Sequence, residues 1–174
     1  AEKSEEDAYR ENVSKLKESL GITLEIRDYS PEATSVLPDS PAADAGIEKG
    51  DGLVAIWGRL TGYMPLRDAV KMLLEKPSIE IKCTIERMVD VAVMGGDTGA
   101  SFSMEFDGLT VSNVKEGTSA FEAGLKKDDL VVAINGRSIR YTPLKKALEM
   151  IKNSKDTVKL TFRRELVLWR RGTT

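Results

Sequence analysis

The chain has 174 residues, of which 41% are hydrophobic and 31% charged, a composition typical of a globular protein with one large or two small domains. Its 26 basic and 28 acidic side chains are intermixed and leave a net charge of −2, so no strong field attracts nucleic acid or anionic lipid. Apolar runs are only a few residues long, and we expect no membrane span. These features predict a soluble, intracellular protein.

The sequence contains no histidine, and this argues against the commonest catalytic devices. Serine and cysteine hydrolases use an imidazole as the base, and most catalytic zinc sites use one as a ligand. The single cysteine, Cys83, excludes internal disulfides and multi-cysteine zinc sites, and we expect it to be a small core residue. We therefore predict that the chain is not an enzyme and holds neither metal nor cofactor.

The chain begins at Ala1, with no initiator methionine and no apolar signal segment. It is either a processed chain or a piece of a longer one, and processing would fit an organelle such as the chloroplast or mitochondrion. The first seven residues are mostly charged. We expect residues 1–11 to be disordered or frayed.

Strand-like and helix-like segments alternate in the first half of the chain. Thr23–Ile26 alternates apolar and polar residues after a small-residue loop at Ser19–Ile22. Pro41 suits a first helical turn, and Gly46 supplies a left-handed helix end. The predicted elements are strands Thr23–Ile26 and Ala33–Leu37, helix Pro41–Ala45, strand Leu53–Ile56, helix Pro65–Leu74 and strand Ile79–Ile85.

The second half of the chain repeats this order. After a shift of 78 residues, Pro41–Arg59 aligns with Ser119–Arg137, and ten of the nineteen aligned positions are identical. The same shift places Pro65–Leu73 on Pro143–Ile151. A period near 80 residues is too long for a solenoid repeat, so each copy is expected to be a small domain. Segregated strands and helices of this kind predict an α+β fold.

The ordered motifs of both copies resemble the PDZ domain family. The first copy has a Ser-Pro-Ala helix start at Ser40, a Gly-hydrophobic-x-x-Gly-Asp turn at Gly46–Asp51 and a strand ending at Gly58. The second copy matches at Thr118–Ala120, Gly124–Asp129 and Leu130–Gly136. The resemblance implies two partly open antiparallel β-barrels or sandwiches, each capped by two helices. We expect domains at residues 12–87 and 88–165, followed by a C-terminal extension at 166–174.

The resemblance also implies a binding mechanism, in which a peptide adds as a strand beside the longer helix while loop amides hold its terminal carboxylate. In the first copy these amides would come from Leu20, Gly21 and Ile22. In the second copy the equivalents would be Ala100, Ser101 and Phe102. The apolar groove residues implied for the two copies are Leu24, Ile26, Leu66 and Val70, and Met104, Leu144 and Leu148.

Two departures from the family pattern affect the expected ligand. Many PDZ domains have histidine at the first position of the longer helix, where this chain has Leu66 and Leu144, so we expect an apolar ligand residue two positions before the terminus. Lys15 and Lys17 precede the first loop, whereas Asp97 precedes the second and would repel a carboxylate. The first copy is therefore expected to capture free C-termini. The second is expected to bind internal segments or nothing.

The expected function is non-catalytic protein–protein interaction as a scaffold, with partner C-termini or internal strands as ligands. Two alternatives stay open. One is a structural subunit in the assembly of a larger, possibly organellar, multi-subunit complex with idle grooves. The other is a regulatory PDZ fragment of a protease.

Overall fold

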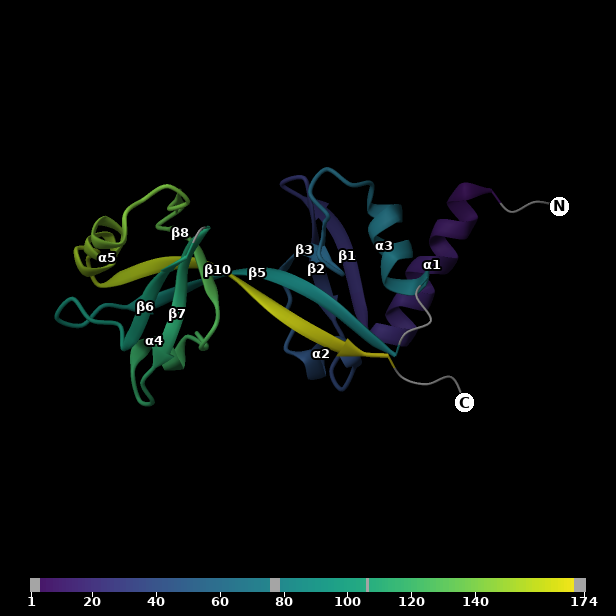
Figure 1. The fold of residues 1–174 in the computed structure, drawn as a ribbon. Helices are drawn as coiled ribbons and strands as arrows, with labels where there is room; N and C mark the ends of the chain where they lie inside the picture. The colour runs from purple at the N-terminus through teal and green to yellow at the C-terminus, as the bar shows by residue number, and fades with distance from the viewer. Residues whose placement is uncertain (1–3, 76–78, 106, 171–174) are drawn as a thin grey trace. The chain divides into compact units, whose positions relative to one another are not determined.

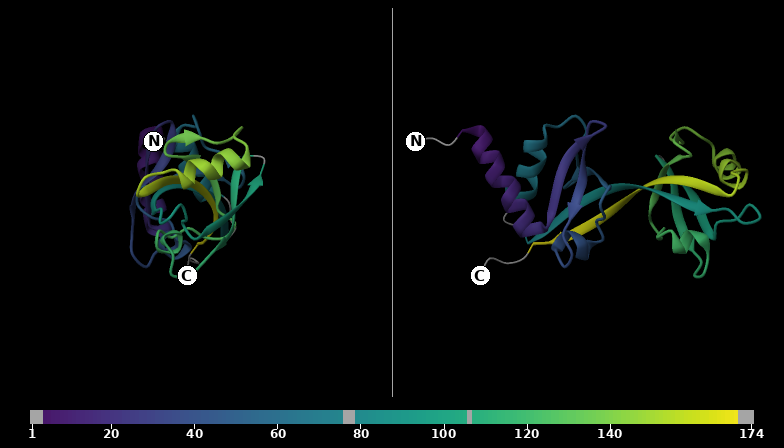
Figure 2. Two further views of the ribbon diagram at one scale, coloured as in Figure 1. Left: turned by 90° about the vertical axis from the view of Figure 1, so that its left-hand side faces the viewer. Right: turned by 180° about the vertical axis from the view of Figure 1, so that it is seen from behind.

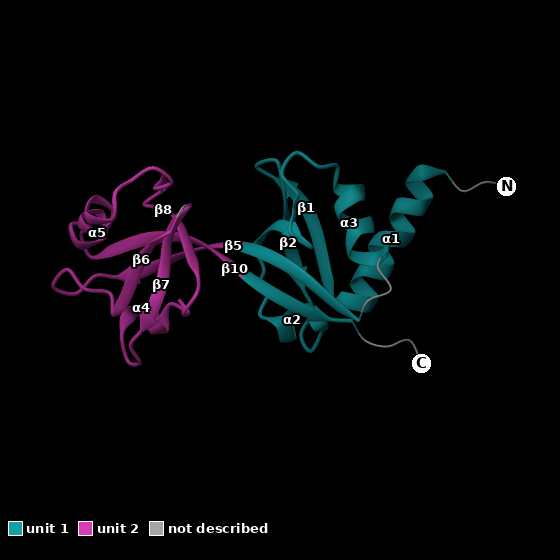
Figure 3. Cartoon of the chain, in the orientation of Figure 1, with its two compact units in different colours: residues 1–85, 165–174 teal, residues 86–164 magenta. Residues whose placement is uncertain are grey.

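The computed structural model describes residues 4–75, 79–105 and 107–170, and these divide into two compact units (Figure 1, Figure 3). Unit 1 extends to Ile85 and includes a second segment that begins at Glu165, whereas unit 2 is Glu86–Arg164. Strands β5 (Glu80–Ala92) and β10 (Thr157–Trp169) each have one part in each unit. Helices accompany antiparallel strands in both units, which confirms the predicted α+β class. The strand path is open and does not close into a barrel.

Unit 1 contains strands in the order β1-β2-β3-β5-β10, with the short β4 paired to β3. Its remaining elements are α1 (Glu5–Leu20), β1 (Ile22–Arg27), β2 (Ser30–Val36), α2 (Pro41–Ala45), β3 (Gly52–Ile56), β4 (Arg59–Leu60) and α3 (Leu66–Glu75). Pro41 starts α2 directly after its N-cap, Ser40, as the sequence indicated.

Helix α1 contradicts the prediction that residues 1–11 are disordered or frayed. The Oγ of Ser4 accepts a hydrogen bond from the amide of Asp7. Three acidic residues occupy the first turn, where their negative charge interacts favourably with the positive end of the helix dipole and stabilises the helix. Leu16 and Leu20 are buried at the other end. The prediction is therefore wrong for residues 4–11, while residues 1–3 lie outside the described part. Unit 1 consequently has three helices among its described residues, one more than the two expected.

The core of unit 1 draws on both ends of the chain. Leu16 and Leu20 of α1 share one apolar cluster with Leu168 of β10, which is 1% exposed. The C-terminal extension predicted from residue 166 forms the end of β10, which continues without interruption through Trp169, and its last residues pack into unit 1. Residues 171–174 lie outside the described part. Cys83 is buried in the same cluster, and burial raises the pKa of its thiol to about 12.

Unit 2 has the strand order β5-β10-β8-β7-β6, with the short β9 paired to β8. Its other elements are β6 (Ala100–Glu105), β7 (Gly108–Val114), α4 (Ser119–Glu122), β8 (Leu130–Ile134), β9 (Arg137–Ser138) and α5 (Leu144–Lys152). Phe162, Leu109 and Ile134 are among the fully buried side chains of its core.

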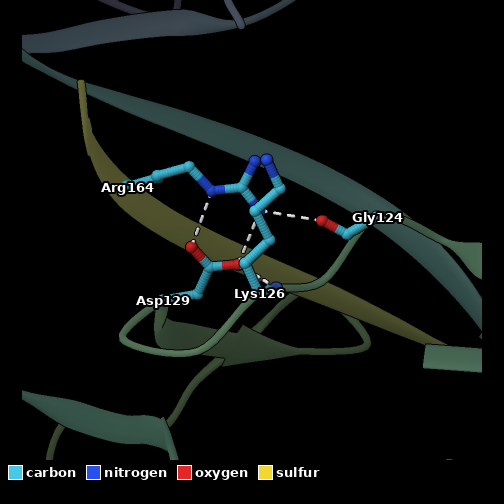
Figure 4. A network of polar contacts seen from close by, with 4 residues as sticks. All are labelled: Gly124, Lys126, Asp129 and Arg164. Carbon is cyan, nitrogen blue, oxygen red and sulfur yellow. Dashed lines mark hydrogen bonds and ion pairs between the residues drawn. The ribbon is translucent and has the colours of Figure 1, made fainter. Parts of the chain in front are cut away.

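A buried ion pair fixes the turn before β8. Arg164 donates from Nε and Nη2 to the two carboxylate oxygens of Asp129, each at 2.7 Å, and Nη2 also reaches the carbonyl of Gly124 at 2.8 Å (Figure 4). The same carboxylate accepts the amide of Lys126 at 2.8 Å. In unit 1, Asp51 accepts the amide of Glu48 at the same distance. The repeated aspartate of the turn motif is therefore a structural acceptor.

Replacing Leu168 by Ala should lower the free energy of unfolding of unit 1 by about 2–5 kcal/mol, because it removes a fully buried side chain. Hydrogen exchange of the full chain should show faster exchange in β1, β2 and α3. The exposed Leu60 of the same unit provides the control, since Leu60→Ala removes little buried surface. Equal effects of the two substitutions would contradict the assignment of the C-terminal strand to the core.

Candidate functional site

Strands β1 and β6 are the outermost strands of their units. In the described part of the chain, β1 pairs with β2 and β6 pairs with β7, and each strand leaves its other edge without a strand neighbour. Such an edge carries backbone donors and acceptors that can pair with an added strand. The candidate site in each unit is therefore this edge, together with the loop before it and the longer helix.

The two edge strands correspond at the same offset of 78 residues. Ile22 pairs with Val36 and Ala100 with Val114, and the register shifts between Thr23 and Leu24 and again between Ser101 and Phe102. Gly21 therefore corresponds to Gly99. The prediction that Ala100, Ser101 and Phe102 form the second loop is wrong, because all three lie in β6.

A close approach between the backbone and a helix-capping side chain explains why both positions are glycine. Gly21 has a φ of 76° and Gly99 a φ of 90°, in the left-handed region that favours glycine. A Cβ at Gly21 would lie 2.1 Å from the Cβ of Ser40, and one at Gly99 would lie 2.1 Å from the Cβ of Thr118. Ser40 and Thr118 are the N-caps of α2 and α4. Each edge strand thus begins against the start of the short helix.

The amide of Gly21 is engaged by helix α1, so the first loop is not a free anion site. It donates to the carbonyls of Leu16 and Lys17 at 3.2 and 3.0 Å and ends the helix. Leu20, predicted to be a loop residue, is the last residue of α1 and fully buried, and Ile22 is buried at the start of β1. Of the three residues predicted to supply the loop amides, Leu20 therefore lies in a helix and Ile22 in a strand.

Helix α1 packs against α3 and β1, the two elements expected to flank the first groove (Figure 1, Figure 2). Leu24 of β1 and Val70 of α3 are buried in the cluster that contains Leu16 and Leu20. Leu66 is half-buried and packs against that cluster, while Ile26 is 44% exposed. The four apolar residues implied for the first groove therefore all lie in unit 1. Two of them, Leu24 and Val70, are buried in the cluster that includes α1 side chains and do not face a ligand.

In unit 2, the residues that correspond to the buried Leu24 and Val70, which are Phe102 and Leu148, are more exposed. Met104 of β6 is 41% exposed and Leu148 of α5 is 38% exposed. Phe102 and Leu144 are half-buried and pack on the core of the unit, as does Ala100 at the start of β6. Ser101 is exposed. Unit 2 thus presents apolar surface on both its edge strand and its longer helix.

The loop before β6 is held by its own side chains. The amide of Gly99 donates to Oδ1 of Asp97 at 2.9 Å, and the amide of Ala100 donates to Oγ1 of Thr98 at 3.3 Å. Lys152, at the end of α5, lies over the loop, since a Cβ at Gly96 would be 2.9 Å from its Cγ. Lys152 is not among the site residues predicted from the sequence, although a basic residue in the last turn of the longer helix was visible there.

The far ends of the two edge strands are fastened differently. In unit 1, Tyr29 and Tyr63 stack with ring centroids 4.9 Å apart, and both have φ above 60°. In unit 2, Arg140 pairs with Asp107 at 3.6 Å.

A cavity of about 520 Å³ lies in unit 1, between the first turns of α1 and α3. It is lined by Glu5, Glu6, Tyr9, Pro65, Leu66 and Arg67.

Residues 91–163 match the family model of the PDZ domain. The chain is 29% identical over 136 residues to the periplasmic serine endoprotease DegP of Escherichia coli (strain K12), which covers 67% of this chain and 29% of that protein. It is 26% identical over 174 residues to glutamate receptor-interacting protein 2 of Xenopus laevis, covering 84% of this chain and 16% of that one. The chain therefore spans less than a third of these curated relatives.

Among solved structures, the choanoflagellate SHANK1 PDZ domain bound to a GIRK3 peptide is 24% identical and aligns with a TM-score of 0.44, covering 47% of this chain and 93% of that domain. The family match places one PDZ domain at residues 91–163, inside unit 2. PDZ domains are non-catalytic modules that bind peptide segments, so this part of the chain is a protein-interaction module. In the described residues, no helix has the length and apolarity needed to cross a membrane.

Replacing Gly99 by Ala should destabilise unit 2 more than replacing Gly124 by Ala. The two glycines have nearly the same φ, 90° and 89°, so the left-handed conformation costs both variants about 1–2 kcal/mol. Only Gly99 is pressed against Thr118, whereas a Cβ at Gly124 meets nothing within 4 Å. Overpacking should add about 1–3 kcal/mol to the loss at Gly99. Urea unfolding measures both, and equal losses would contradict the close approach.

Proposed function

We propose that the chain is a tandem pair of PDZ-like domains in which unit 2 binds peptides and unit 1 has its groove closed by helix α1. The observation that carries this proposal is the exposure of one matched pair of helix residues. Val70 in α3 is 1% exposed, and Leu148, 78 positions later in α5, is 38% exposed. The same position is core in one unit and surface in the other.

The difference has a structural cause in the N-terminal helix. Leu16 and Leu20 of α1 share the apolar cluster that buries Val70 and Leu24. The described residues of unit 2 have no counterpart of this helix, because the strand β5 precedes the loop there. A ligand strand in unit 1 would have to displace side chains that contribute to the core, and each such side chain stabilises the unit by about 1.5–3 kcal/mol.

In unit 2, the ligand would add as an antiparallel strand to the free edge of β6. Ligand side chains on one face of that strand would meet Phe102 and Met104 from β6, and Leu144 and Leu148 from α5. Leu144 stands where many PDZ domains have histidine, so an apolar ligand residue is favoured over serine or threonine at the position facing it. Burying one such residue contributes about 1.5–3 kcal/mol to binding.

A second reading, in which the chain is the regulatory PDZ portion of a protease, is favoured by the match to DegP over 67% of the chain. The chain has no histidine, so the imidazole of a serine protease would have to lie in another part of a longer protein. Membership of a multi-subunit complex and residence in an organelle stay predictions from the sequence.

Replacing Met104 by Asp should weaken peptide binding at least tenfold, whereas replacing Ile26 by Asp should leave it unchanged. The two residues hold matched positions on β6 and β1 and are similarly exposed, at 41% and 44%. Fluorescence polarisation of the full chain with labelled Gly-Gly-Gly-Ser-Leu-Val-Leu-amide would measure the effect. Loss of binding in Ile26→Asp, with retention in Met104→Asp, would assign binding to unit 1 and contradict the proposal.

A further inference from the structure

The loop before β6 contains a carboxylate that already binds the amide on which terminal capture would depend. Oδ1 of Asp97 accepts the N–H of Gly99 at 2.9 Å. Gly99 corresponds to Gly21, whose amide the PDZ resemblance assigns to a ligand's terminal carboxylate. A free C-terminus would therefore compete with Asp97 for the same donor.

The backbone holds Asp97 in this position. Met94 and Asp97 exchange two backbone hydrogen bonds, at 2.9 and 3.1 Å, across a tight turn formed by Gly95 and Gly96. Both glycines have positive φ, 63° and 82°, which such a turn requires. The carboxylate then reaches the amide two residues further on, as aspartate commonly does in turns. Its contact with Gly99 is therefore part of the folded loop.

Charged side chains of both signs lie near the loop. Lys152 lies over Gly96 and supplies one positive charge, while Asp97 supplies one negative charge. The second amide, that of Ala100, is engaged by the buried Thr98. In unit 1 the equivalent glycine amide is engaged by the end of a helix, which a ligand cannot replace without unwinding it. Asp97 is exposed, so in unit 2 the blocking group is a single side chain.

We propose that Asp97 excludes free carboxylate termini from unit 2, so that this domain selects internal peptide segments or uncharged ends. This inference rests on the proposed peptide binding by unit 2. A segment that continues past the loop needs the edge of β6 and the apolar residues of α5, but it does not need the amides of Gly99 and Ala100. A ligand's terminal carboxylate and the Asp97 carboxylate would repel each other at the one N–H donor. The free-acid form of a peptide therefore loses the advantage over its C-terminal amide that capture by loop amides would give it.

The test uses the full chain and one heptapeptide, Gly-Gly-Gly-Ser-Leu-Val-Leu, labelled with fluorescein and prepared as the free acid and as the C-terminal amide. The unmodified protein should bind the acid no more tightly than the amide. Asp97→Ala should raise the affinity for the acid about tenfold, roughly the effect of one charge-assisted hydrogen bond, and leave the amide unchanged. Asp97→Asn, which keeps an acceptor but removes the charge, should fall between them.

Asp128→Asn is the matched control, because it removes one exposed negative charge from another loop of unit 2 and should change neither affinity. A tenfold preference of the unmodified protein for the acid, or an unchanged acid-to-amide ratio in Asp97→Ala, would overturn the inference while peptide binding by unit 2 still stood.

Acetate tests the same loop without depending on the peptide. In ¹H–¹⁵N spectra, sodium acetate should shift the Gly99 amide of Asp97→Ala more than that of the unmodified protein. Equal shifts would overturn the inference. If neither peptide bound but acetate distinguished the two proteins, the proposed peptide binding would fail for this ligand while the role of Asp97 at the loop amide would be supported.

Discussion

Each unit begins its edge strand at a glycine whose Cα lies against the side chain that caps the following short helix. Gly21 meets Ser40 and Gly99 meets Thr118, and both glycines have left-handed backbone conformations. The carbonyl of each glycine accepts an amide from the far end of the next strand, Leu37 in unit 1 and Lys115 in unit 2. This arrangement sets the start of the edge strand and the position of the loop. The glycine carbonyls thus have equivalent hydrogen-bond partners in the two units, whereas the glycine N–H groups donate to different acceptors.

The partner of this N–H differs between the two units. In unit 1 the N–H ends helix α1, whose residues Leu16 and Leu20 are part of the core, so the helix and the fold are stabilised together. In unit 2 the N–H meets the exposed carboxylate of Asp97, which a rotation of one side chain can remove. The core of unit 1 also includes Leu168 from the end of β10. Unit 2 contains the residues that match the PDZ family model.

Much of the fold could be predicted from residue patterns. Helix α2 was predicted with its observed bounds, and the predicted helix Pro65–Leu74 lies within one residue of α3 at each end. Helix α1 is not among the predicted elements, although Ser4 followed by three acidic residues is a helix-start signal, because a charged stretch near a chain terminus also fits a frayed end. The loop of unit 2 was placed two residues too late. Side chains alternate with a period of two, so a slip of two residues keeps every apolar residue on its predicted face and leaves no trace in the pattern. The burial of Val70 depends on α1 packing, which no local pattern contains.

The central claim is that unit 2 binds the ligand strand and that unit 1 does not. The most direct measurement is a ¹H–¹⁵N titration of the full chain with Gly-Gly-Gly-Ser-Leu-Val-Leu-amide, with resonances assigned. We expect shifts in the amides of β6 and α5, and unchanged amides in β1, α1 and α3. Shifts at Gly21 and along β1 and α3, with β6 unchanged, would contradict it.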